Sequence, residues 1–142
     1  MIHAIMEAMG IALDAQFGDT CAIYAEEVPQ NLERPCFFLS CIHADSEVYP
    51  SHRHRRRNQF AVQYFPAEDD RARQECLDAA ERMLQCLETV RTVDRTPYLG
   101  TDIHYEIKDG VLHFFVNYNF FTRKRAAYDR MEYMRQSFKQ KG

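Results

Sequence analysis

The stretch that decides the fold is residues 101–121, TDIHYEIKDGVLHFFVNYNFF. Apolar and polar side chains alternate on both sides of Asp109-Gly110, and this period of two indicates half-buried strands. An Asp-Gly pair suits the type I′ turn of a two-residue hairpin loop, because both residues tolerate a positive φ. The pattern predicts a β-hairpin whose turn sets the register of its strands.

This turn specifies which side chains face each other. The pairs expected on one face are Ile107 with Leu112, Tyr105 with Phe114 and Ile103 with Val116, and those on the other are Glu106 with His113 and His104 with Phe115. The first face is uniformly apolar and should pack on helices. The second face is mixed and should be half solvated or covered by a partner.

Two segments outside the hairpin have the spacing of amphipathic helices. Residues 2–17 form the first, which Gly18-Asp19 ends. Residues 67–90 form the second and stronger one. Its expected buried stripe is Leu77, Ala80, Leu84 and Leu87, flanked by Cys76 and Met83.

The remaining apolar segments predict strands at 20–28, 36–48 and 57–65, with residues 91–100 as a connection that has room for a short edge strand. We therefore expect one α+β domain over residues 1–122, with a mainly antiparallel sheet of about four to five strands and two helices packed on one face. Residues 123–142 are expected to add a C-terminal amphipathic helix. Its apolar stripe, Ala127, Met131, Met134 and Phe138, should dock on a neighbouring chain.

Composition narrows the class of protein. The 142 residues carry a net charge of −3 and are 46% hydrophobic, as in ordinary globular domains. No apolar stretch approaches the roughly 20 residues that span a bilayer, and the first 17 residues do not resemble a secretory signal. The five cysteines form no C-x-x-C pair, so we expect reduced, buried thiols and synthesis in a cytoplasm.

The run SHRHRRR at residues 51–57 concentrates positive charge in this acidic chain. Three interpretations stay open: a solvated strand end, a protein interface, or a contact with phosphates. Aromatic residues do not alternate with these arginines, as a stacking platform for single-stranded nucleic acid would require. We expect an extended loop here, disordered or partly ordered in an isolated subunit.

Motifs for catalysis or cofactor binding do not occur in the sequence. The nearest approach to a metal site is the group Cys36, Cys41, His43, His52 and His54, but its spacing does not suit zinc, and three arginines adjoin it. Glu106 and His113 would face each other across the hairpin, as a stabilising pair rather than an acid–base pair. We expect no catalytic residue, no cofactor and no metal.

The order of motifs resembles that of phage and prophage tail terminators, small tail-completion proteins of long-tailed bacteriophages. The resemblance covers about residues 1–122 and rests on IYAEEV, LERPCFF, FAVQYFP and LGTDIHYEIKDGVLHFFVNYNFF, read in that order. Its most specific parts are EEVPQNLERPCFF and YEIKDGVLHFFVNYNFF. The segment after Arg123 lies outside it.

The resemblance implies a structural protein of the virion tail, assembled in the host cytoplasm, and not an enzyme. Members form a ring, typically of six copies, that caps the tail tube, stops its polymerisation and meets the head-side connector or stopper protein. Its partners would be its own copies, the tube protein and the connector, with DNA only passing through the lumen and no membrane. A small nucleic-acid-binding module is the alternative. The expected interface residues are Arg53, Arg55, Arg56, Arg57, Arg123, Lys124, Arg125, Met131, Met134 and Phe138.

Overall fold

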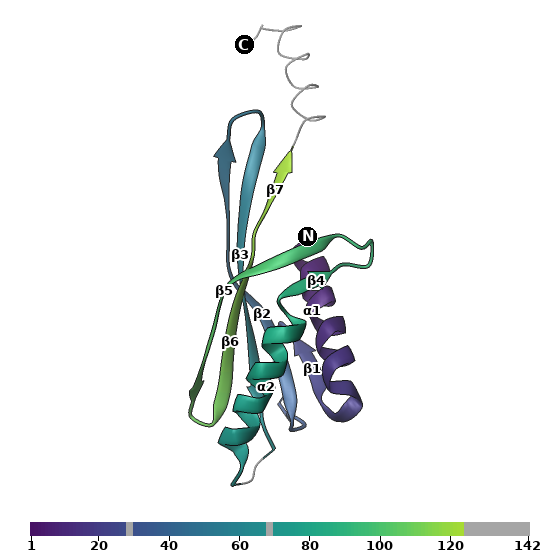
Figure 1. Cartoon of the computed structure of the whole chain (residues 1–142), viewed down its shortest axis with the longest axis vertical. Coiled ribbons are helices and arrows are strands. Elements are labelled where there is room, and N and C mark those ends of the chain that lie inside the picture. Colours follow the sequence, from purple (N-terminus) through teal and green to yellow (C-terminus); the bar gives the residue numbers. More distant parts are fainter. Residues whose placement is uncertain (28–29, 68–69, 124–142) are drawn as a thin grey trace, which may run out of the picture.

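The computed structural model describes residues 1–27, 30–67 and 70–123. Two α-helices, a short 3-10 helix (Gly18–Thr20) and seven strands follow one another along this part of the chain. The α-helices and strands carry the labels of Figure 1. They are α1 (Ile2–Phe17), β1 (Ala22–Ala25), β2 (Cys36–Tyr49), β3 (Arg53–Phe65), α2 (Ala72–Cys86), β4 (Thr89–Arg91), β5 (Pro97–Lys108), β6 (Val111–Tyr118) and β7 (Phe120–Arg123).

The sheet is larger than expected, and it is mixed. Strands make up 49% of the structure. The strand order is β1-β2-β3-β6-β5-β4, with β7 also paired to β3, and β1 runs parallel to β2. The sheet curls into a half-barrel, and both helices lie on the same side of it (Figure 1).

The expected fold class was therefore wrong in the number and direction of the strands. The parallel pair β1–β2 depends on contacts between distant segments, which local periodicity does not encode. Thr89 and Val90 of β4 lie in the segment for which the pattern predicts helix, and Phe120 and Phe121 of β7 lie in the segment for which it predicts the hairpin. The two predicted helices are present, whereas the expected C-terminal helix falls in residues 124–142, outside the described residues.

The hairpin register is confirmed at four of the five expected pairs. Strands β5 and β6 pair Ile107 with Leu112, Tyr105 with Phe114, Glu106 with His113 and His104 with Phe115. The pairing of Ile103 with Val116 was wrong, because the register shifts between Thr101 and His104. Asp102 has a φ of 50° at this irregularity, which resembles a β-bulge.

The second helix is shorter than its pattern suggested, and most of its expected buried face is confirmed, with Leu87 buried just beyond the end of the helix. Its buried residues are Cys76, Ala79, Ala80 and Met83. Leu77, expected in the buried stripe, is 41% exposed. The buried face of α2 is therefore centred on Cys76, Ala79, Ala80 and Met83, and Leu77 lies at its edge.

One hydrophobic core fills the space between the helices and the sheet. Its largest fully buried side chains include Phe37, Phe60, Phe114 and Tyr118. The Tyr118 hydroxyl donates a hydrogen bond to the Leu87 carbonyl (2.6 Å), and burial raises the pKa of this tyrosine. Gly100 completes the packing, because a Cβ there would lie 2.8 Å from Val116 Cγ2.

All five cysteines are free thiols and are buried or half-buried. Burial raises the pKa of each, and that of Cys86 to about 11. A thiol with a raised pKa is a poor nucleophile at neutral pH, which is consistent with a packing role.

Candidate protein interface

Three strands project beyond the helices as an arm. We define the arm as residues 42–57, which are the outer halves of β2 and β3 with their turn, together with residues 120–123 of β7. The body is residues 1–41 and 58–119. Figure 1 shows the arm at one end of the long axis, with the β5–β6 turn and the start of α2 at the other end.

The basic run lies in a strand, which corrects the expectation of a loop. Ser51 and His52, both with positive φ, form the turn, and β3 begins at Arg53. Strand β2 pairs with Arg53–Arg57 on one side, and β7 pairs with Arg53–Arg56 on the other. Hydrogen-bond ladders on both sides hold these residues extended, although arginine carries little strand signal of its own.

Alternation along β3 divides the basic side chains between two faces. The first face carries Arg53, Arg55 and Arg57, and the second carries His54 and Arg56. The guanidinium of Arg53 lies 4.3 Å from the centre of the Phe121 ring, which is 48% exposed.

Two further contacts order the first face. The Phe121 and Tyr49 rings meet edge to face, with their centroids 5.4 Å apart. Arg57 donates two hydrogen bonds of 2.9 Å to the Asp45 carboxylate, and His43 Nε2 lies 3.1 Å from the same group. The hydrogen bonds from Arg57 and then from His43 lower the pKa of Asp45.

The second face is hollowed. A shallow pocket of about 340 Å³ is lined by Ala44, Asp45, Ser46, His54, Arg56 and Thr122. The Arg56 guanidinium lies 5.7 Å from the centre of the Phe120 ring, which in turn packs against Tyr98. His54 is only 9% exposed, and its Nε2 has no hydrogen-bond partner among the described residues.

Asn58 joins the arm to the body. It is 1% exposed, and its Nδ2 donates to the Tyr118 carbonyl (3.0 Å). Its backbone N–H donates to Asn119 Oδ1 (3.1 Å), in the gap between β6 and β7. The register of β3 is the same on both sides of this gap, so β7 continues the line of β6.

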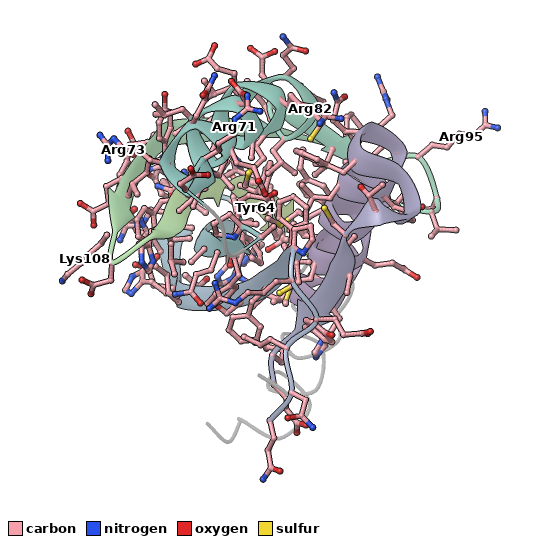
Figure 2. The ribbon with its side chains drawn as sticks, turned by 90° about the horizontal axis from the view of Figure 1, so that it is seen from below. Tyr64, Arg71, Arg73, Arg82, Arg95 and Lys108 are labelled. Carbon is pink, nitrogen blue, oxygen red and sulfur yellow. The ribbon has the colours of Figure 1, made fainter. Side chains whose placement is uncertain are left out.

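Charge is divided between the two regions. The arm has five arginines and two acidic residues, for a formal net charge of +3. The body sequence has 17 acidic residues and seven basic ones, for a formal net charge of −10. Figure 2 shows that basic residues of the body, such as Arg73, Arg95 and Lys108, point outward and apart, while Tyr64 points inward.

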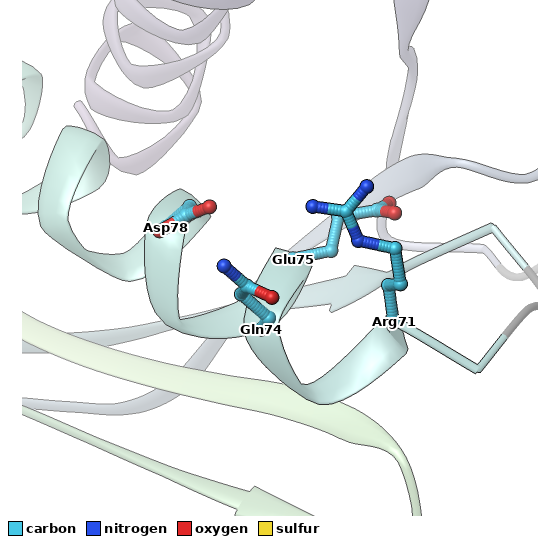
Figure 3. A pocket seen from close by; sticks show the side chains of 4 residues that line it. All are labelled: Arg71, Gln74, Glu75 and Asp78. Atoms are coloured by element: carbon cyan, nitrogen blue, oxygen red, sulfur yellow. The ribbon is translucent and has the colours of Figure 1, made fainter.

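A second hollow lies at the start of α2 and is lined by Arg71, Gln74, Glu75 and Asp78 (Figure 3). The carboxylate of Glu75 accepts hydrogen bonds from the Tyr64 hydroxyl (2.8 Å) and the Ala67 backbone N–H (3.1 Å). Burial, and then the hydrogen bond to Glu75, raise the pKa of Tyr64. Glu75 therefore ties α2 to β3 and to the preceding loop.

The candidate chemical groups do not converge. Among the described residues, no three His, Cys, Asp or Glu side chains are placed to hold a metal ion. Cys36 is in the core, whereas His43 is exposed on the arm. His113 Nδ1 lies 3.2 Å from Gln63 Nε2, and in the part of the chain described here no ion pair joins His113 to Glu106. None of the described helices is long and apolar enough to cross a bilayer.

The arm brings together only some of the expected interface residues. Arg53, Arg55, Arg56 and Arg57 lie in β3, and the backbone of Arg123 pairs with that of Arg53. The others, Lys124, Arg125, Met131, Met134 and Phe138, lie outside the described residues. Sequence reasoning missed His54, Phe120 and Phe121 on the arm. The signal that could have identified Phe120 and Phe121 is the pair of aromatic residues directly after Asn119, where the hairpin pattern was expected to continue.

Comparison with known proteins identifies the family. No curated protein matches the sequence. One solved structure aligns with 84% of this chain and 95% of its own, at 9% identity and a TM-score of 0.34. A family profile described as "Phage tail terminator protein" matches residues 4–129. This chain, with its acidic body and its basic arm, belongs to the phage tail terminator family, whose members are structural components of the virion tail.

Proposed function

We propose that this protein is a ring-forming tail terminator without enzymatic activity. Its copies, six in the arrangement implied by the resemblance, associate head to tail at the end of the tail tube. The ring stops polymerisation of the tube and offers its outer surface to the head-side connector or stopper protein. Assembly takes place in the host cytoplasm. The observation that carries this proposal is the separation of charge between the arm and the body of one chain.

A closed ring needs two different surfaces that fit each other, because each copy contacts its neighbours head to tail. The arm supplies one surface, since it projects from the body with a net charge of +3. The body supplies the other with a net charge of −10. Opposite potentials favour contact between an arm and a neighbouring body, and they disfavour contacts between two arms or two bodies.

Arm side chains also have the composition of an interface. Arg53, Tyr49 and Phe121 form an ordered aromatic and guanidinium cluster outside the core. Arginine and aromatic residues are enriched at the centres of protein interfaces.

The test replaces Arg55, Arg56 and Arg57 together by alanine. We expect fewer rings and longer, uncapped tubes in negative-stain images of the variant mixed with its tube protein, while thermal unfolding stays unchanged. The control replaces Arg73, Arg91 and Arg95, which are exposed on the body and change the charge equally. Normal termination by the arm variant would contradict the proposal.

A nucleic-acid-binding module is the second candidate, because a guanidinium beside an exposed Phe121 is also a feature of single-strand binding. The strongly acidic body opposes it by repelling phosphates. A salt titration with labelled DNA separates the two functions. Binding at physiological salt that weakens steeply as salt rises would favour the module.

A further inference from the structure

We propose that the hollow on the second face of the arm is a receptor for a carboxylate side chain of the next copy in the ring. The inference rests on the proposed ring and names one contact within it. The receptor groups are the Arg56 guanidinium, His54 Nε2 and the hydroxyls of Ser46 and Thr122.

The arm places these groups on one surface. Strand pairing sets Ser46 opposite Arg56 and Thr122 opposite His54, across three adjacent strands. All four residues line the same hollow. Packing against Phe120 positions the Arg56 guanidinium. Ordered donors lose little entropy on binding, so they bind more strongly than mobile ones.

The hollow has donors that its own chain does not use. Within the described residues, no carboxylate pairs with Arg56. His54 is nine-tenths buried, yet its Nε2 lacks a partner, and an N–H at this atom could donate to a ligand in the hollow. An orphaned buried polar atom costs free energy unless a ligand or water satisfies it. Asp45 also lines the hollow, but both of its oxygens accept hydrogen bonds from Arg57.

The chemistry favours a protein carboxylate over a nucleic-acid phosphate. A guanidinium offers two parallel N–H groups that match the two oxygens of a carboxylate. Only one arginine lines the hollow, whereas phosphate binding along DNA uses rows of cations. The acidic body would repel DNA at the same time that it presents carboxylates to another copy.

The geometry points to Glu106 as the occupant. It lies on β5 near the β5–β6 turn, at the opposite end of the molecule from the arm (Figure 1). Its side chain is exposed, and in the described part of the chain residues 101–108 of β5 pair only with β6. Glu106 cannot reach the arm of its own chain, because β5 separates it from Tyr98 by eight residues, about 26 Å. The proposed contact places this acidic side chain against the basic arm of the next copy, so that two different surfaces meet as a head-to-tail ring requires.

The experiment uses charge reversal in the full chain, read out by native mass spectrometry and by ring counts with the tube protein. Arg56→Glu and Glu106→Arg should each weaken ring formation by at least about tenfold, the loss of one charge-assisted contact. The double variant Arg56→Glu/Glu106→Arg should recover it. Arg55→Glu, with the same charge change on the other face, should weaken it less. Arg56→Glu/Glu7→Arg should not recover it.

Four results would overturn the receptor. They are full ring formation by Arg56→Glu, no recovery in the Glu106 double variant, equal recovery in the Glu7 double variant, and DNA binding at physiological salt that Arg56→Glu abolishes. If the unaltered protein still forms rings, any of the first three results overturns the receptor but leaves the proposed function standing. Absence of rings from the unaltered protein with its tube would instead remove the proposed function itself.

A second measurement does not depend on rings. Acetate, as the simplest carboxylate, should shift the imidazole NMR signals of His54 in a saturable way in the unaltered protein. Chloride at equal ionic strength should not, and Arg56→Gln should abolish the response. A His54 signal that ignores acetate in the unaltered protein would overturn the receptor.

Discussion

The body and the arm are built on the same strands but are held together by different forces. In the body, β3 carries Phe60, Val62 and Tyr64 into a core closed by two helices. In the arm, the same strand carries arginines and a histidine, and its contacts are hydrogen-bond ladders, ring contacts and one ion pair. The body therefore determines the stability of the fold, while the arm leaves its side chains available for a partner.

The largest test of this difference compares two phenylalanines. Phe114 is fully buried, so Phe114→Ala should lower the free energy of unfolding by about 3–5 kcal/mol. Phe121 on the arm is 48% exposed, and Phe121→Ala should lower it by less than about 1 kcal/mol. Urea denaturation measures both values. Similar losses for the two variants would mean that the arm is part of the core.

An intermediate effect is expected where the two regions join. Asn58→Ala removes the donor to the Tyr118 carbonyl and should cost about 1–3 kcal/mol, the penalty for an unsatisfied buried group. Hydrogen exchange of the arm amides should also accelerate more than that of the body. Gln59→Ala, at the next and less buried position, is the control. Unchanged exchange in the Asn58 variant would show that this residue does not anchor the arm.

The smallest effect concerns the ion pair of the arm. Hydrogen bonds from Arg57 lower the pKa of Asp45, so the carboxylate should titrate below its ordinary value of about 3.9. The stabilisation is therefore present above that pH, and it is lost as the pH falls through the lowered value. Carboxyl NMR should show the midpoint rising in Arg57→Gln. Because the Arg57–Asp45 pair is exposed, we expect Arg57→Gln and the unaltered protein to have the same urea midpoint at pH 7.

Local patterns predicted the parts of the fold that local contacts determine. The Asp109-Gly110 turn set four of the five expected pairs, and the spacing from Ile2 to Phe17 gave α1 with its bounds. The fifth pair failed at the irregularity near Asp102, because a bulge shifts the register without changing the alternation of residues.

Contacts between distant segments determine the features that sequence patterns did not predict, which are the parallel strand pair, the extended basic run and the hollow. The pairing of Ala22–Ala25 with Cys36–Leu39 places two strands side by side in parallel, which no single segment encodes. The arginines of residues 53–57 are extended because β2 and β7 flank them, and not because of their own propensity. Sequence reasoning identified them as an interface candidate from charge alone, and it missed the hollow, whose residues come from three strands.

The register of β3 with β6 and then with β7 is unbroken across the Asn58 junction, and this has a mechanical consequence. A pull on the arm along its length would act parallel to the strands, so the hydrogen bonds from β3 to β2 and β6 would carry the load together and in shear. An arm attached through a loop would instead concentrate the load on a few bonds at its base. The continuous strand thus gives the chain a tether that resists extension.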